Sequence, residues 1–438
     1  MSETNPRESD LILGGQILPP VNAAILGGLA GVKQRLESES IAERLQALNN
    51  AVAYGDDGID LALRSLSDND DKVRRLAKRL LRDRFGEAGK KAFINHDVAS
   101  YFLKIDDWNK EEYYSGIGIA DPDNNAYYRE VYLPGMWKKD EDYQTKQFKS
   151  LLQSSSANRM QALILEAVEN KLDFFRFIFE SIQSNNTPLS NLKALQIGDR
   201  KIDWEEVDLE NDEFDRDLLV KPKNDRLYQT DISSLLILFP NLEYLNVYGN
   251  YHEYLSPNNL ALKQFCAGKS IKNKLKTLVI GDADVDRTIS NISPTSFPEL
   301  EHFEIWFNDT KDIMPTIQAI SPILSKKATP KLKYLALCNC QVSEALIRAV
   351  IRTPVIEKLD VLDFRSGSMM DGIIQYILDC QKIRNLKLLN ISDNYLTERG
   401  IERLRQLPCK IEAANQFQSK HAKDERDLRF SRYSVSAE

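Results

Sequence analysis

The sequence predicts an α/β solenoid with strands inside and helices outside, preceded by a small all-α module. Three observations lead to this fold class. A nine-residue apolar frame recurs through the C-terminal part of the chain. Segments with helical periodicity follow the clearest copies of the frame. Near the N-terminus, an Arg-x-x-Ala pair recurs after thirty residues inside a helical region.

The frame is clearest in "KLKYLALCNC", which has the spacing L-x-x-L-x-L-x-x-C. We number its positions from the first leucine, so apolar residues occupy positions 1, 4 and 6, and Asn or Cys occupies position 9. This is the leucine-rich-repeat signature, and such repeats stack into a solenoid with a horseshoe course. Eight copies begin at Met160, Leu192, Leu242, Leu275, Leu300, Leu332, Leu359 and Leu386.

The frame has a physical cause. Alternate side chains of a strand point to one face, so positions 4 and 6 are expected to face the core. The residue at position 9, such as Asn394, is expected at a tight turn, where its side chain bonds backbone groups of neighbouring coils. The copy at Met160 has Val168 at position 9, so a strand and a helix are both open there. "VSEALIRAVIRT" is a predicted outer helix with Ser343 as its N-cap.

Near the N-terminus, "IAERLQALNNAVAYG" and "DKVRRLAKRLLRDRF" have helical spacing. Arg44-x-x-Ala47 recurs in them as Arg74-x-x-Ala77. Helix pairs with this period and an alanine at the crossing resemble HEAT-like repeats. After Leu407, "LPCKIEAANQ" is expected to supply a last half-coil that caps the stack. The predicted organisation is an extended lead-in (1–21), a HEAT-like module (22–96), a connecting region with short strands (97–159), the leucine-rich-repeat domain (160–416) and a polar tail (417–438).

Composition favours a soluble protein. The 438 residues carry a net charge of −7, which argues against a general nucleic-acid binder. The five cysteines are odd in number, and no signal peptide precedes them. We therefore expect reduced thiols and a cytoplasmic protein. Leu11–Val32 has no charged residue, but Pro19-Pro20 and five glycines argue against a membrane span.

Two charged stretches have alternative interpretations. Residues 72–91 hold nine basic and two acidic residues, so nucleic-acid binding is one interpretation. A solvated helix face is the favoured one, because residues 1–96 hold 14 basic and 14 acidic residues. Residues 203–217 hold nine acidic residues and one arginine. This segment either attracts a basic partner or is a solubilising insertion, and the second is favoured.

The sequence holds four histidines and no nucleophile elbow, zinc-helix motif or phosphate loop. A repeat scaffold without these motifs is typical of a binding protein, so no enzymatic activity, cofactor or metal is predicted. The expected function is a protein-interaction scaffold whose protein partner binds the concave face of the repeats. Nucleic acid and membrane are not expected partners.

The concave face is predicted from the frame. Positions 3, 5 and 7 point away from the core, and aromatic residues and arginine at these positions usually carry interface energy. The predicted contact residues are Tyr244, Tyr248, His302, Glu304, Trp306, Tyr334, Asp363 and Arg365. An alternative is that Trp306 and the tyrosines pack beneath an inserted loop, such as the acidic one.

The chain also resembles a known group over nearly its whole length. The segments that carry the resemblance are "LILGGQILPPVNAAILGGLAGVKQRL", "DISSLLILFPNLEYL", "FPELEHFEIW", "PVIEKLDVLDF" and "LLNISDNYLTERGIERL". They resemble poorly characterised bacterial leucine-rich-repeat proteins from phototrophs, which carry an N-terminal HEAT-like module of the phycobilisome-lyase repeat type. The resemblance implies an alternative function as a lyase-like or chaperone-like accessory factor of the light-harvesting antenna. Nucleic-acid binding through residues 72–91 is a less favoured third hypothesis.

Overall fold

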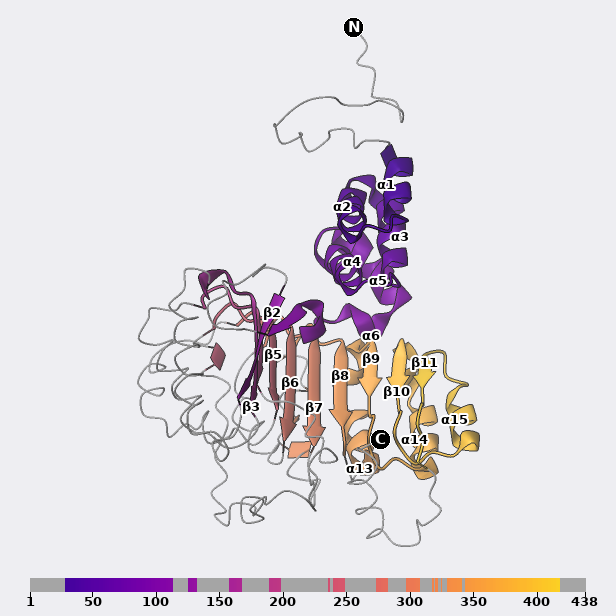
Figure 1. Cartoon of the computed structure of the whole chain (residues 1–438). Coiled ribbons are helices and arrows are strands. Elements are labelled where there is room, and N and C mark those ends of the chain that lie inside the picture. Colours follow the sequence, from indigo (N-terminus) through magenta and orange to yellow (C-terminus); the bar gives the residue numbers. More distant parts are fainter. Residues whose placement is uncertain are drawn as a thin grey trace, which may run out of the picture. The chain divides into compact units, whose positions relative to one another are not determined.

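The structure is a computed structural model of the whole chain (Figure 1). It divides into two compact units, Met1–Asn109 and Lys110–Glu438, which we describe separately. The described residues are 28–112, 125–131, 157–167, 189–197, 235–236, 239–248, 273–282, 297–307, 317–318, 320–321, 324, 329–340 and 343–417. The predicted lead-in, the acidic segment 203–217 and residues 418–438 lie outside them.

The first unit is helical in its described part. Its helices are α1 (Gly28–Leu36), α2 (Ile41–Ala51), α3 (Gly55–Ser65), α4 (Asp71–Asp83), α5 (Gly86–His96) and α6 (Val98–Tyr101), with 3₁₀ turns at Val52–Tyr54 and Ile105–Asp107. Small residues allow close packing between successive helices, and Ala47, Ala51 and Ala77 are fully buried. No helix among the described residues is both long and apolar enough to cross a membrane.

The repeated arginine makes the same bond in both copies. Arg44 of α2 donates to the carbonyl of Ser38, six residues earlier, at 2.7 Å. Arg74 of α4 donates to the carbonyl of Asp68, again six residues earlier. Arg44 also forms an ion pair of 3.1 Å with the Asp68 carboxylate. Arg74 thus bonds the turn that precedes its own helix, α4. Arg44 of α2 contacts the same turn through the Asp68 carboxylate.

The helices that follow α2 and α4 share a second signal. Both α3 and α5 begin with Gly-x-x-Gly, and the first glycines, Gly55 and Gly86, have φ of 53° and 63°. Other residues adopt this left-handed conformation at a cost. At Gly58 a Cβ would lie 1.9 Å from the carbonyl oxygen of Ala51. The pair α2–α3 and the pair α4–α5 therefore share both the arginine bond and the Gly-x-x-Gly start.

The second unit is built on a sheet whose strands follow the order of the chain, from β1 to β11. Every described pairing from β2 to β11 is parallel. The strands are β1 (Asn109–Glu112), β2 (Asn125–Val131), β3 (Ala162–Ala167), β4 (Ala194–Ile197), β5 (Tyr244–Tyr248), β6 (Thr277–Asp282), β7 (His302–Phe307), β8 (Tyr334–Cys338), β9 (Val361–Asp363), β10 (Leu388–Asn390) and β11 (Lys410–Glu412).

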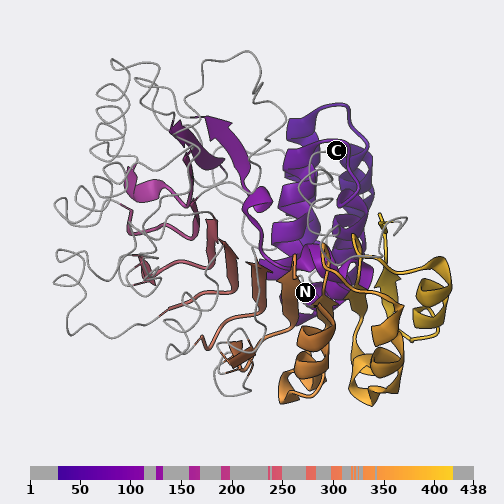
Figure 2. The same ribbon diagram turned by 90° about the horizontal axis from the view of Figure 1, so that it is seen from below.

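Helices follow the last strands. Helix α13 (Ser343–Val350) follows β8, α14 (Ile374–Asp379) follows β9, and α15 (Glu398–Leu404) follows β10. They lie side by side along one face of the strands, as the orange and yellow helices of Figure 2 show. Short 3₁₀ turns lie at Ala157–Arg159, Pro354–Lys358, Asp371–Ile373 and Gln381–Asn385. A parallel strand in each coil, with helices on one side, confirms the α/β solenoid.

All eight predicted frames form strands in one register. The residues at position 4 pair in a continuous row of Leu163, Leu195, Leu245, Leu278, Phe303, Leu335, Leu362 and Leu389. All of them belong to one buried apolar core, which also contains Leu346 of α13 and Ile401 of α15. The frame at Met160 is the strand β3, so the strand interpretation of that copy is confirmed and the helix is not.

The turn after each of the last strands is also repeated. Asn339, Ser366 and Asp393, at position 8 of three successive frames, have φ between 55° and 58°. Next to them, Asn394 at position 9 donates through its amide nitrogen to the carbonyls of Phe364, Ile391 and Ser392. The amide thus joins its own coil to the preceding one, as expected.

The predicted final half-coil is present. Strand β11 pairs with β10, and Asn415 has the same left-handed conformation. Gln416 bonds this turn as Asn394 bonds the preceding one. Its amide nitrogen donates to the carbonyls of Ile391 and Ala413. Its amide oxygen accepts from the Leu396 N–H at 3.0 Å. The amide of Gln416 therefore bonds the last turn as the amide of Asn394 bonds the turn before it.

Position 2 adds charges of alternating sign along the rim of the sheet. Lys276 pairs with Glu243 of the preceding coil at 2.7 Å, and Lys387 pairs with Asp360 at 3.5 Å. Neighbouring coils with like charges at this position would repel each other. The alternation therefore favours the observed register.

Replacing Leu335 by Ala should lower the free energy of unfolding of the repeat unit by about 2–5 kcal/mol, because a fully buried side chain leaves a cavity. Urea denaturation followed by circular dichroism measures the change. Arg352→Ala is the control, since Arg352 is exposed and its loss should cost less than about 0.5 kcal/mol. If Leu335→Ala lowers the free energy of unfolding by less than about 1 kcal/mol, the placement of Leu335 in the core is contradicted.

Candidate interaction site

The face of the sheet opposite the leucine core is polar at its centre, and we call it the polar face. It is formed by frame positions 3, 5 and 7. The register places His302 beside Tyr334, and Trp306 beside Cys338. Glu304, Ala336 and Asp363 form one row across β7, β8 and β9. Residues far apart in the sequence are thereby neighbours on one surface.

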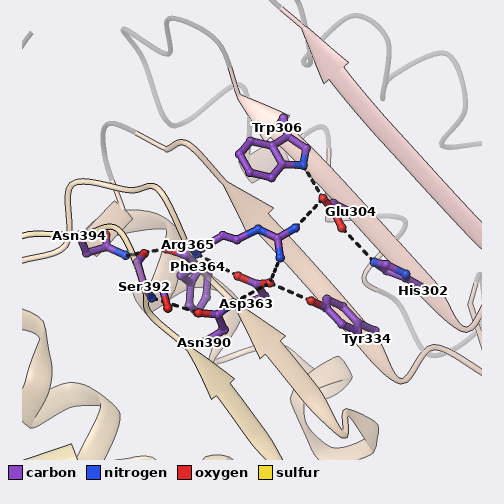
Figure 3. Close-up of polar contacts among 10 residues, drawn as sticks. All are labelled: His302, Glu304, Trp306, Tyr334, Asp363, Phe364, Arg365, Asn390, Ser392 and Asn394. Carbon is purple, nitrogen blue, oxygen red and sulfur yellow. Dashed lines mark hydrogen bonds and ion pairs between the residues drawn. The ribbon is translucent and has the colours of Figure 1, made fainter. Parts of the chain in front are cut away.

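Glu304 is the acceptor for three side chains (Figure 3). Its Oε2 lies 3.2 Å from His302 Nε2. Its Oε1 accepts from Trp306 Nε1 and, at 2.8 Å, from a terminal nitrogen of Arg365. His302 and Trp306 come from the same strand, two residues before and after Glu304, so the strand alternation itself aligns these three side chains.

Asp363 is the second acceptor and is fully buried. One oxygen accepts from the Arg365 backbone N–H at 3.0 Å. The other accepts from the Tyr334 hydroxyl at 2.8 Å, from the Asn390 amide at 3.2 Å, and pairs with the Arg365 guanidinium at 2.9 Å. Strands β8, β9 and β10 therefore all supply donors to one carboxylate.

Arg365 joins the two carboxylates across an intervening strand. Arg365 lies in the turn just after β9, and its guanidinium reaches Glu304 of β7. Ala336 of β8 lies between Glu304 and Asp363 in the register. A large side chain at position 5 of β8 would lie in the path of this bridge. The guanidinium also lies 5.1 Å from the centre of the Trp306 ring, which is cation–π distance.

Burial and charge act in opposite directions on the two carboxyls. Burial alone would raise the pKa of Glu304, but the hydrogen bond from His302 and the charge of Arg365 hold this pKa well below its usual range. Burial raises the pKa of Asp363 above its ordinary value, against the lowering effect of Arg365. Burial and the neighbouring Asp363 also raise the pKa of Tyr334, so its hydroxyl keeps the proton that it donates.

Six of the eight residues predicted as contacts form this network: His302, Glu304, Trp306, Tyr334, Asp363 and Arg365. Tyr244 lies on the same face in β5, with Thr277 between it and His302 in the register. Tyr248 is the last residue of β5, and its side chain lies outside the described structure. Sequence reasoning missed Asn390, although its position 5 in the next frame placed it beside Asp363.

The aromatic side chains of the polar face are buried. Trp306 is 6% exposed, Tyr334 4% and Tyr244 4%. Periodicity identified the face on which they lie, but their hydrogen bonds and burial depend on neighbours that a single strand does not reveal. The side chain of Arg365 is 25% exposed, so it is the member of the network that solvent reaches most.

The basic stretch 72–91 is largely engaged by its own unit. Arg82 donates to the carbonyls of Ser100 and Tyr101 and pairs with Asp107 at 2.7 Å. Lys78 lies 3.9 Å from the same carboxylate. These contacts join α4 to α6 and to the 3₁₀ turn that follows it.

The described residues contain no group of three or more His, Cys, Asp or Glu placed to hold a metal ion. Cys380 and Cys409 are free thiols. Glu304 and Asp363 accept their hydrogen bonds from side chains and backbone of the protein itself.

The fold and this site define an α/β solenoid with a buried polar network on its sheet. No protein-family model matches the sequence, and no curated protein matches it. Among solved structures, a Bacteroides fragilis protein is similar with 19% identity and a TM-score of 0.48, covering 66% of this chain and 75% of that one. An internalin from Listeria monocytogenes is similar with 14% identity and a TM-score of 0.26, covering 60% of this chain and 58% of that one.

Glu304→Gln should destabilise the protein near neutral pH, because the parent carboxylate is bound by Arg365 and His302. A carboxyl whose pKa is lowered by folding stabilises the protein above its unfolded value of about 4.3, and this contribution is lost as pH falls. The difference in unfolding free energy between parent and variant should therefore narrow from pH 6 to pH 3.

Urea denaturation at each pH measures this difference. Glu299→Gln is the matched control, because Glu299 makes an exposed pair with Lys331 at 2.6 Å and should contribute less than about 1 kcal/mol. A difference for Glu304→Gln that stays constant or widens on acidification would contradict the assignment.

Proposed function

We propose that the chain is a non-enzymatic protein-interaction scaffold whose protein partner binds the polar face around Arg365. The observation that carries the proposal is the fixed guanidinium. Glu304 and Asp363 hold it at 2.8 and 2.9 Å, and a quarter of the side chain is exposed. An arginine that is already ordered loses little conformational freedom on binding, and arginine is enriched among the residues that dominate interfaces.

The buried members of the network then have a positioning role. Tyr334 and Asn390 orient Asp363, and His302 and Trp306 orient Glu304. Partner contact is centred on Arg365 in this proposal. It requires no chemistry from the carboxylates.

The hydrogen bonds support a binding role over a catalytic one. Each oxygen of Glu304 and of Asp363 accepts at least one bond from a protein donor. A general base needs an oxygen within reach of a substrate proton. Both carboxylates are occupied in holding Arg365.

The N-terminal unit is proposed to be a HEAT-like module. The repeated arginine bonds and the recurrence of Gly-x-x-Gly at α3 and α5 support this proposal. The role in the light-harvesting antenna stays a prediction from the resemblance.

Arg365→Lys should abolish partner capture. Lysine keeps the charge but loses the fork that reaches two carboxylates at once, so the contact group is no longer held in place. The immobilised full chain is incubated with a native bacterial lysate, and bound proteins are identified by mass spectrometry. We expect parent-specific proteins to fall at least tenfold with the variant.

Arg405→Lys is the matched control, since Arg405 is exposed just after α15 and pairs with Glu398 of that helix. It should capture the same proteins as the parent. Circular dichroism checks that both variants fold. Equal capture by a folded Arg365→Lys variant, or no enrichment by the parent, would contradict the proposal.

A further inference from the structure

The polar network contains more acidic than basic side chains. Glu304 and Asp363 are both buried, and the ion pairs described for them are with Arg365 and His302. If both carboxyls are ionised, Arg365 balances one negative charge. The other is balanced only if His302 is protonated. An unbalanced charge inside a protein is costly.

The hydrogen bonds favour the ionised form of both carboxyls. Asp363 receives four bonds, from the backbone N–H and guanidinium of Arg365, the hydroxyl of Tyr334 and the amide of Asn390. Glu304 receives bonds from Trp306, Arg365 and His302. A protonated carboxyl must itself donate a hydrogen bond, and among these contacts only the Tyr334 hydroxyl and the His302 ring nitrogen can accept one.

We propose that His302 carries the balancing proton at neutral pH, and that the network is a pH-sensitive clasp joining β7 to β9. The imidazolium donates from Nε2 to Glu304 across 3.2 Å. Glu304 in turn holds Arg365, which holds Asp363. The network then holds two negative charges, on Glu304 and Asp363, and two positive charges, on Arg365 and His302.

The ring of His302 lies between β6 and β8 in the register. On β8 the ring of Tyr334 lies 4.1 Å from the imidazole, tilted by 32°. On β6 the register neighbour is Thr277, followed on the same face by Val279 and Gly281, and none of these three titrates. On β9, Asp363 and Arg365 act on His302 through Glu304 and Tyr334. The described ionisable groups on this face around His302 are thus Glu304, Tyr334, Cys338, Asp363 and Arg365.

The clasp weakens as pH rises. An exposed histidine has a pKa of about 6.5 and is mostly neutral at pH 7.5. His302 instead keeps its proton there, because losing it would leave one buried negative charge without a partner. The contribution of His302 to the free energy of unfolding is complete at low pH. It is lost as the pH rises and the ring loses its proton.

Nitrogen-15 NMR of the histidine rings tests the proposal directly on the full chain. The sequence has only four histidines, His96, His252, His302 and His421, and comparison with His302→Gln assigns the signal of interest. At pH 7.5 both ring nitrogens of His302 should be protonated. In Glu304→Gln the same ring should be neutral at this pH. If His302→Gln does not fold, the other three His→Gln variants assign the signal by elimination.

A thermal series provides the second readout. Between pH 7 and pH 9.5 the Tm of the parent should fall by at least about 2 °C more than that of His302→Gln. A neutral His302 ring at pH 7.5 in the parent would overturn the proposal. An imidazolium that persists in Glu304→Gln, or parallel Tm curves for the two proteins, would overturn it as well.

Discussion

The structure of the repeat unit depends on a single strand register. The same pairing that aligns Leu335 with Leu362 in the core places Ala336 between Glu304 and Asp363 on the other face. Side chains alternate with a period of two, so a slip by one residue would exchange the two faces. The apolar row and the charged row therefore specify each other. Without this register neither the core nor the arginine bridge forms.

The polar face adds an interaction that the backbone ladder does not supply. Parallel pairing joins each strand only to its neighbours, whereas the contact of Arg365 with Glu304 joins β9 to β7. Buried ion pairs are often no better for stability than apolar packing. Their retention here agrees with a role in fixing one geometry of the guanidinium. A guanidinium with one fixed geometry is what the proposed binding function requires.

Much of the fold was predictable because the frame is local. Every strand from β3 to β10 was identified from leucine spacing, and the turn role of Asn394 followed from position 9. Gln416 was missed, because a glutamine is one methylene longer than the asparagine of the frame and begins from a half-coil without a leading leucine. The repeated glycines of α3 and α5 were present in the sequence, but their meaning depends on the close approach of Ala51 to Gly58.

The site was predictable only in part. Alternation placed His302, Glu304 and Trp306 on one face, but burial depends on what packs across the strands. The hydrogen bond between Glu304 and Arg365 joins residues that are 61 positions apart in the sequence. Insertions of different length separate the frames, so residue spacing alone does not reveal this contact. Asn390 was overlooked because amide side chains were not among the residue types sought for a contact surface.

The most direct measurement of the central claim is a double-mutant cycle between Glu304 and Arg365. Unfolding free energies of the parent, Glu304→Gln, Arg365→Lys and the double variant are compared at pH 7. A bridge that holds the guanidinium should give a coupling energy of at least about 1 kcal/mol, as for other residues in one polar network. Effects that add to within about 0.5 kcal/mol would show that the two side chains act independently and that Arg365 is not held by Glu304.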